Sequence, residues 1–319
     1  MSSEGMRRYV GSALHRRAEA YGWDALGVLA GLAEGMSDAG PPELALRACR
    51  AAGGRDRAAY PAAASLHALH AGIHLVDDLI DGEERSCVDL PPGLRANLAL
   101  ALQCIAIEVL ENTPRDRRAA LMLAAAAAGR ETSRGQELDA NGAATEEDCW
   151  RIVEAKTPPL FTAALRMGAL SGGAHPDAAE ALAAAGVPLG VLVQLGDDLG
   201  DVMADELHPD WQRPGDNLAL RFAMEADHPE RERFLELLPQ AADPVARAQA
   251  REIVVRSGAF SFCVHHMRVA ADEARSAILA APLADHAPVL AIIDHLEAPV
   301  VELLAEVGAD DLAREPALA

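Results

Sequence analysis

The feature that most constrains the fold is the segment HALHAGIHLVDDLID, residues 67–81. On an α-helix, at 100° per residue, its polar side chains fall within one arc of about 100°, and most of the other positions are apolar. Such a helix is buried over most of its circumference. The polar arc consists of His67, His70, His74, Asp77, Asp78 and Asp81. Three carboxylates on a buried helix need a counter-charge, which a divalent metal ion would supply.

The rest of the chain indicates an all-α protein. Alanine-rich blocks and an aromatic content of 3% disfavour strands, because alanine is the best helix former. No segment alternates apolar and polar residues as a half-buried strand does. Proline and glycine breaks predict helices at about 10–34, 43–52, 61–81, 94–111, 115–129, 145–151 and 160–170, two more opened by Pro176 and Pro188, and helical structure again from 217 to about 308. Without a linker or a repeat, we expect a single all-helical domain over residues 1–319.

Charge and cysteine content limit the partners and the compartment. The net charge of −21 argues against nucleic acid or an anionic membrane surface as a main partner. Five cysteines without CxxC spacing indicate free thiols in a reducing compartment. The first residues lack an apolar signal core, and the longest uncharged apolar run, 181–196, is short of a membrane span. These features predict a cytoplasmic protein without stable membrane insertion.

A second aspartate cluster repeats the spacing of the first. In QLGDDLGD, residues 194–201, the aspartates again stand at i, i+1 and i+4 on an otherwise apolar helix. One such triplet is weak evidence, but two all-aspartate copies indicate a site. Carboxylate oxygens suit Mg²⁺, which binds through a few carboxylates together with substrate phosphates. Two facing clusters would therefore hold a diphosphate and stabilise its charge as it leaves. The predicted metal ligands are Asp77, Asp78, Asp81, Asp197, Asp198 and Asp201.

Lys156 is the only lysine among 28 basic residues. A bias towards Arg, Ala and Gly is typical of a GC-rich genome, in which arginine replaces lysine wherever either side chain serves. A single remaining lysine therefore marks a position where the two are not interchangeable.

These motifs resemble those of the trans-isoprenyl diphosphate synthases, the polyprenyl synthetase family. DDLID and QLGDDLGD are similar to the two aspartate-rich motifs of that family. His70 stands where the family commonly has a histidine, Gly135-Gln136 resembles its GQ element, and Lys156-Thr157 resembles its KT pair. Gly190 and Gln194 fit the GxxxQ that precedes the second motif. The resemblance covers about residues 50–220.

The resemblance implies an isoprenoid-synthase-type helical bundle in which the two motifs face each other across a central cavity. It also implies a homodimer, with Mg²⁺ as cofactor. Lys156, Thr157 and Gln194 would act on an allylic diphosphate, and His70 and Gln136 would help to bind substrate. After ionisation, the double bond of isopentenyl diphosphate would attack the allylic cation, and the released pyrophosphate would take the proton.

The sequence departs from the family at the expected isopentenyl diphosphate site. GGRDRAAYP and GEERSCVDLP stand in place of the family's GGKRxRP and Arg-Arg-Gly elements. The candidate residues for this diphosphate are Arg55, Arg57 and Arg85, and Arg213 is the one candidate after the second motif. The loss of basic groups leaves open a class I terpene cyclase or a transferase to another acceptor. However, only eleven aromatic residues are present to stabilise a cyclising cation. Gly72 and Ile73 provide no aromatic floor to a tunnel, which favours a linear product of C20 or longer.

Two non-prenyl hypotheses remain from the residues alone. His70 and His74 have the i, i+4 spacing of a zinc pair or of a di-iron bundle, but the zincin pattern needs a glutamate at position 71, which is alanine. A non-enzymatic helical protein that binds metal or a partner is the other hypothesis. It predicts that removing the aspartates changes stability and no turnover.

Overall fold

The structure, a computed structural model, describes residues 2–23, 39–82 and 90–306. Within these ranges every regular element is helical, which confirms the all-α class. The long helices are α1 (Ser2–Tyr21), α3 (Pro41–Ala51), α4 (Asp56–Ile80), α5 (Pro92–Glu108), α6 (Arg115–Asn141), α7 (Glu146–Lys156), α8 (Pro158–Gly172), α9 (Pro176–Ala183), α10 (Gly186–Met203), α11 (Leu218–Glu225), α12 (Arg231–Leu237), α13 (Pro244–Arg256), α14 (Ala259–Ala280) and α15 (Ala287–Glu306). Short 3₁₀ turns are η2 (Val109–Asn112), η3 (Pro209–Trp211) and η4 (Leu238–Gln240).

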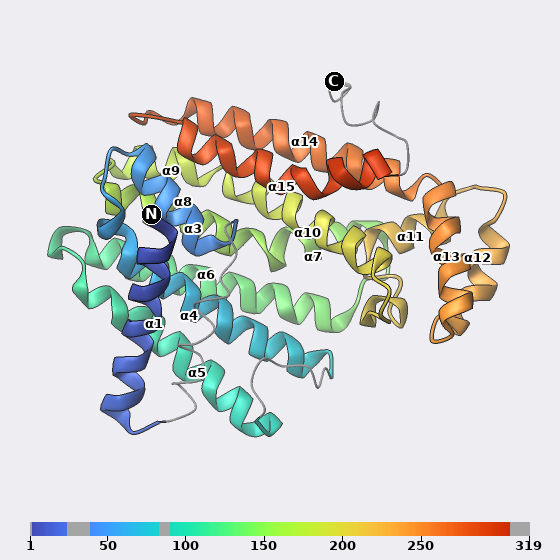
Figure 1. The fold of residues 1–319 in the computed structure, drawn as a ribbon, viewed down its shortest axis with the longest axis horizontal. Coiled ribbons are helices and arrows are strands. Elements are labelled where there is room, and N and C mark those ends of the chain that lie inside the picture. Colours follow the sequence, from blue (N-terminus) through green and yellow to red (C-terminus); the bar gives the residue numbers. More distant parts are fainter. Residues whose placement is uncertain (1, 24–38, 83–89, 307–319) are drawn as a thin grey trace.

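The two helices that carry the aspartate motifs, α4 and α10, are packed on several sides. Helix α4 contacts α3, α5, α6 and α8, while α10 contacts α7, α8 and α14. Figure 1 shows α14 and α15 along one side of the bundle and α12 and α13 together at one end. One connected cluster of buried apolar side chains, mostly alanine and leucine, extends from Met6 to Ile293. This continuity supports our proposal that the chain forms a single domain.

Several helix boundaries differ from the sequence expectation. Helix α4 begins at Asp56, so Pro61 lies inside the helix rather than in its first turn. Helix α6 runs to Asn141 and includes the GQ element, because no proline interrupts it before Gly142, whose positive φ of 73° ends it. Helix α10 begins at Gly186, ahead of Pro188. Of the helix expected at 10–34, residues 24–34 lie outside the described residues, and α1 covers the earlier part.

A sharp corner joins α7 to α8. Helix α7 starts with a capping box between Thr145 and Asp148, which satisfies two backbone donors. It ends at Lys156, because the two prolines that follow disfavour helical backbone before them and suit the first turn of a new helix. The predicted break at Lys156–Pro159 is therefore confirmed. The break is confined to Thr157, because Lys156 is the last residue of α7 and Pro158 is the first of α8.

Two helical stretches, Pro92–Asn112 and Pro176–Met203, are long and apolar enough to cross a membrane by composition alone. The second carries the second aspartate motif and packs inside the bundle, as a core helix does. The four described cysteines are free thiols, as expected.

Candidate active site

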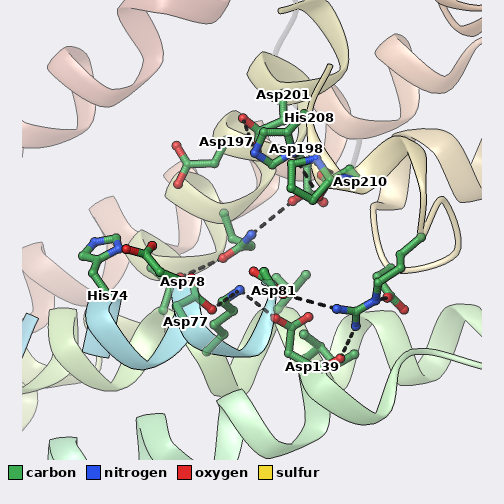
Figure 2. Close-up of a pocket in the computed structure, with 18 residues that line it drawn as sticks. His74, Asp77, Asp78, Asp81, Asp139, Asp197, Asp198, Asp201, His208 and Asp210 are labelled. Carbon is green, nitrogen blue, oxygen red and sulfur yellow. Dashed lines mark hydrogen bonds and ion pairs between the residues drawn. The ribbon is translucent and has the colours of Figure 1, made fainter. Parts of the chain in front are cut away.

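One cavity of about 360 Å³ brings the two aspartate motifs together. Its walls are the carboxyl-terminal parts of α4 and α10, the end of α7, part of α6 and the segment after α10. Figure 2 shows the α4 aspartates on one side and the α10 aspartates on the other. All six predicted metal-binding residues line it, together with Lys156, Thr157, Gln194 and Arg213.

Lys156 reaches the α4 side of the cavity. Its Nζ lies 2.7 Å from Oδ2 of Asp139 and 3.2 Å from Oδ1 of Asp77. Burial opposes the positive charge, but the carboxylates of Asp77 and Asp139 outweigh it and raise the pKa of the lysine above its ordinary value. Lys156 is therefore a fixed cation in a wall of carboxylates.

Gly135 explains how Lys156 meets Asp139. A Cβ at this position would lie 2.3 Å from the backbone oxygen of Ala155, so only glycine lets α6 pack against the end of α7. Asp139 follows one turn later on the same face of α6, where its side-chain oxygen accepts a hydrogen bond from the ammonium of Lys156.

Gly190 has the same role on α10. A Cβ there would lie 2.4 Å from Cα of Pro158, so the glycine allows α10 to approach the start of α8. Gln194, one turn further, then meets Thr157, whose hydroxyl donates to its Oε1 at 2.8 Å. The GxxxQ spacing thus joins α10 to the corner after Lys156.

Asp198 differs from the other predicted ligands. It is 5% exposed, and both carboxylate oxygens accept hydrogen bonds, Oδ1 from Gln194 at 3.1 Å and Oδ2 from the backbone N–H of Leu218 at 3.2 Å. Burial raises the pKa of Asp198 to about 7. Asp198 thus lines the cavity with both carboxylate oxygens already engaged in hydrogen bonds.

Two carboxyls that face the cavity have raised pKa values, because they are buried and because other aspartates lie close to them. Burial, and then the neighbouring Asp201, raises the pKa of Asp197 to about 6. Burial, and then Asp77, raises the pKa of Asp81 to about 6. A cation bound among these groups would relieve both effects.

The carboxylates fit a hard divalent cation. Oδ1 of Asp77 is buried and accepts no hydrogen bond, although it forms the ion pair with Lys156. Aspartate oxygens are the ligands that Mg²⁺ takes. The residues that would hold such ions are Asp77, Asp78, Asp81, Asp197 and Asp201.

Arg213 also lies in this wall. Its guanidinium contacts Asp81 at 3.3 Å and Asp216 at 2.7 Å, and it donates to the backbone oxygen of Asp139. The loop after α10 is thereby tied to α4 and α6, as Figure 2 shows for Asp81 and Asp139.

The structure does not bring Arg55 and Arg57 to the cavity. Both stand at the start of α4 and are exposed, and 20 helical residues separate Arg57 from Asp77, about 30 Å along the helix. The prediction that they help to hold isopentenyl diphosphate gains no support from this cavity, since neither arginine lines it. Arg85 lies outside the described residues.

Gln136 and His70 stand behind the cavity rather than in it. Gln136 is buried and lines a separate pocket of about 190 Å³ with the apolar side chains of Ile73, Val76 and Ile80. Nε2 of His70 lies 2.9 Å from Nε2 of His74, which does line the cavity. Burial lowers the pKa of His70 to about 3, so the ring is neutral at neutral pH.

Sequence reasoning missed several cavity residues. Asp139 was recognisable only once α6 was known to continue, because it then follows Gly135 by one turn. His208 and Asp210 belong to the sequence HPD just after the second motif, in a segment expected to be an irregular polar loop. Asp216 completes the wall near Arg213.

Comparisons with known proteins agree with this geometry. The sequence model of the polyprenyl synthetase family matches residues 42–254. The chain is 34% identical over 183 residues to a (2E,6E)-farnesyl diphosphate synthase of Mycobacterium tuberculosis, covering 54% of this chain and 49% of that protein. It is 32% identical over 179 residues to a geranylgeranyl diphosphate synthase of Methanosarcina mazei, covering 52% and 55%. The chain thus spans about half the length of these curated relatives.

Solved structures share the fold. A geranylgeranyl pyrophosphate synthetase from Pyrococcus horikoshii superposes with a TM-score of 0.76 at 19% identity, over 92% of this chain and 95% of that one. A decaprenyl diphosphate synthase from Rhodobacter capsulatus gives a TM-score of 0.75 at 21% identity, over 94% and 96%. At such identities these similarities establish the architecture alone.

Proposed function

The chain belongs to the polyprenyl synthetase family, and on that premise we propose that it is a Mg²⁺-dependent prenyltransferase. In this proposal it ionises an allylic diphosphate and condenses it with isopentenyl diphosphate to a linear prenyl diphosphate of C20 or longer. The observation that carries the proposal is the pair of aspartate clusters facing each other across one cavity, with Lys156 in the cavity wall beside Asp77.

Each part of the wall has a task in this reaction. Divalent ions held by the aspartates supply electrostatic stabilisation of the leaving diphosphate. Lys156, fixed by Asp77 and Asp139, presents its ammonium to the same oxygens. Thr157 and Gln194 orient the corner that carries Lys156, since their hydrogen bond links it to α10.

The pocket that Gln136 lines supports the assignment of a linear aliphatic product. Its α4 side consists of Ile73, Val76 and Ile80, its other side consists of the polar residues Gln103, Ser133, Gln136 and Glu137, and its described wall contains no aromatic side chain. Gly72 packs against α5, where a Cβ would lie 3.2 Å from the backbone oxygen of Ala99. A prenyl chain entering here would meet aliphatic side chains on the α4 side and, in the described wall, no aromatic ring, which is the basis for proposing C20 or longer.

We include a homodimer and a cytoplasmic location in the proposal. Leu94 and Leu100 on α5 and Leu123 on α6 are all more than half exposed. Exposed leucines on two helices that contact each other suit an interface with a second copy.

A second candidate is favoured by the scarcity of cations. The cavity residues that the structure describes include one lysine, Lys156, and one arginine, Arg213, and each forms ion pairs with aspartates. By sequence, 24–38 contain no basic residue, 83–89 contain only Arg85 and 307–319 contain only Arg314. A second diphosphate would need more positive charge than this. The alternative is a terpene cyclase, or a transfer of the prenyl group to an acceptor other than isopentenyl diphosphate.

One experiment separates the candidates. The full-length protein is incubated with farnesyl diphosphate and Mg²⁺, with and without isopentenyl diphosphate, and the products are identified by mass spectrometry. An elongated diphosphate supports the prenyl diphosphate synthase, whereas a hydrocarbon, alcohol or prenylated acceptor supports the alternative. Lys156→Gln should reduce either turnover by about 10²–10³-fold, as loss of one electrostatic donor does. No consumption of the allylic substrate under any condition would refute both candidates.

A further inference from the structure

We propose that Asp201, His208 and Asp210 form a cation site with mixed nitrogen and oxygen ligands, which takes a transition-metal ion such as Co²⁺ or Zn²⁺ in preference to Mg²⁺. One ligand atom from each residue lies within 4.8 Å of the other two. Nε2 of His208 is 3.6 Å from Oδ1 of Asp201, and its Nδ1 is 3.2 Å from Oδ1 of Asp210. The proposed function gives the site its catalytic meaning, but cation binding is a property of these three side chains.

Local capping explains only part of this arrangement. His208 is the N-cap of η3, and its Nδ1 accepts from the backbone N–H of Asp210 at 3.5 Å. The same HPD sequence occurs at residues 175–177, where Nδ1 of His175 accepts from the backbone N–H of Asp177 at 3.3 Å. The contact between histidine and the aspartate two residues later is therefore a property of the HPD sequence.

The environment of His208 is what differs. A third ligand, Asp201, comes from the last turn of α10, and all three residues line the main cavity (Figure 2). The side chain of His208 is 34% exposed, whereas that of His175 is 74% exposed. Only the second HPD sequence is thus placed where a cation would also meet the proposed diphosphate.

Asp210 is held in place from behind. Its Oδ2 accepts from the side-chain amide of Asn217 at 2.8 Å, and this amide also donates to the backbone oxygen of Asp198 at 2.9 Å. Asn217 is 1% exposed and caps α11. The carboxylate is therefore fixed with its Oδ1 directed towards His208, as the supporting partners of a metal ligand usually fix it.

The presence of a histidine nitrogen among the ligands determines which metal ion the site would prefer. Mg²⁺ takes oxygen ligands in near-ideal octahedral geometry, whereas imidazole suits later ions such as Zn²⁺, and the affinity of a site with nitrogen and oxygen ligands rises from Mn²⁺ to Co²⁺. The two contacts involve different ring nitrogens of His208, and one ion can bind only one of them. With bonds of about 2.1 Å, adjacent ligand atoms stand about 3 Å apart, so the three ligand atoms, which lie within 4.8 Å of one another, would move closer together around a bound ion. Asp201 would then bind the transition-metal ion, and Mg²⁺ would bind to the three aspartates on the α4 side, where the imidazole of His74 also lines the cavity. The two sides of the cavity would hold different metals.

The test is a titration of the full-length protein with Co²⁺ in the presence of excess Mg²⁺, followed by the visible absorption of bound Co²⁺. We expect the wild type to bind Co²⁺ under this competition. His208→Asn keeps a side-chain acceptor that can cap η3 but lacks the imidazole, and it should weaken Co²⁺ binding at least tenfold, roughly the loss caused by disturbing a metal's ligand set. His175→Asn, the same change in the matching HPD sequence, should bind Co²⁺ as the wild type does.

The results that would refute this metal site differ from the results that would refute the proposed function. If the wild type binds no Co²⁺ in excess Mg²⁺, or if His208→Asn binds it as tightly as the wild type, the site is refuted even when Mg²⁺-dependent turnover is intact. Asp210→Asn provides a second variant, expected to weaken Co²⁺ binding likewise, and unchanged binding would count equally against the site. Normal Co²⁺ binding in a protein that never consumes an allylic diphosphate would leave the site standing and refute the function.

Discussion

Replacing Asp198 by asparagine should stabilise the protein at pH 8. Asp198 is buried, and burial raises the pKa of its carboxyl from 3.8 to about 7. A difference of about three units corresponds to about 4 kcal/mol of free energy that the ionised group costs the folded state at high pH. Asparagine removes this charge while keeping the shape of the side chain.

The gain is reduced by one hydrogen bond. The carboxylate accepts from both Gln194 and the N–H of Leu218, but an amide has a single acceptor oxygen. Losing one of these bonds in a buried site costs about 1–3 kcal/mol. The net expectation is that Asp198→Asn increases the free energy of unfolding by about 1–3 kcal/mol at pH 8.

The sign of the difference in unfolding free energy between the variant and the wild type depends on pH. Between pH 4 and pH 7 the unfolded carboxyl has lost its proton, whereas the folded one retains it, so wild-type stability falls as the pH rises through this window. Near pH 4 the gain disappears and only the lost hydrogen bond remains, so the variant should be the less stable protein there. Relative to the wild type, the variant therefore gains up to about 4 kcal/mol across the window.

Denaturant unfolding in metal-free buffer at pH 4, 6 and 8 measures this difference. Asp227→Asn, at an exposed position, is the matched control and should show no such trend. A stability difference between Asp198→Asn and the wild type that is equal at pH 4 and pH 8 would refute the assignment of Asp198 as a buried carboxyl with a raised pKa.

Three further predictions follow from packing, surface and charge. Gly135→Ala should destabilise the protein by about 1–3 kcal/mol in denaturant unfolding, because its Cβ would lie 2.3 Å from a backbone oxygen. Gly129→Ala on the same helix should be tolerated, because its Cβ would lie 3.4 Å from the side chain of Leu69, and equal effects of the two changes would contradict the packing argument. Leu100→Glu combined with Leu123→Glu should give a monomer in light scattering, and an unchanged mass would exclude this face as the dimer contact. Mg²⁺ should raise the thermal unfolding midpoint and a chelator should reverse the rise, because bound ions relieve repulsion among the cavity aspartates; a midpoint indifferent to both would count against a metal site.

The sequence was sufficient for the parts of the site that follow helical periodicity. Spacing of i, i+1 and i+4 on two apolar helices placed both aspartate motifs on single faces, and the prolines after Lys156 indicated the corner that exposes it. Both features are local, so they depend on neither the length of a helix nor the path of a loop.

Features that depend on length or on a loop were not predictable in this way. Arg55 and Arg57 resemble the arginines of the family's basic element in sequence, but they lie about 30 Å from Asp77 along α4. This separation became clear only when the structure showed that α4 begins at Asp56. Asp139 needed the continuation of α6 past residue 129. His208 meets Asp201 across the end of α10, where no periodic rule relates the two positions.

The central claim is that both aspartate clusters, with divalent metal, ionise an allylic diphosphate in this cavity. The most direct measurement is the release of inorganic pyrophosphate from farnesyl diphosphate by the wild type, Asp77→Asn and Asp197→Asn, with Mg²⁺ and with a chelator. We predict metal-dependent release by the wild type and a loss of about 10²-fold or more in each variant, since each removes a carboxylate from one side of the clamp. Release at the wild-type rate from either variant, or in the presence of the chelator, would contradict the claim.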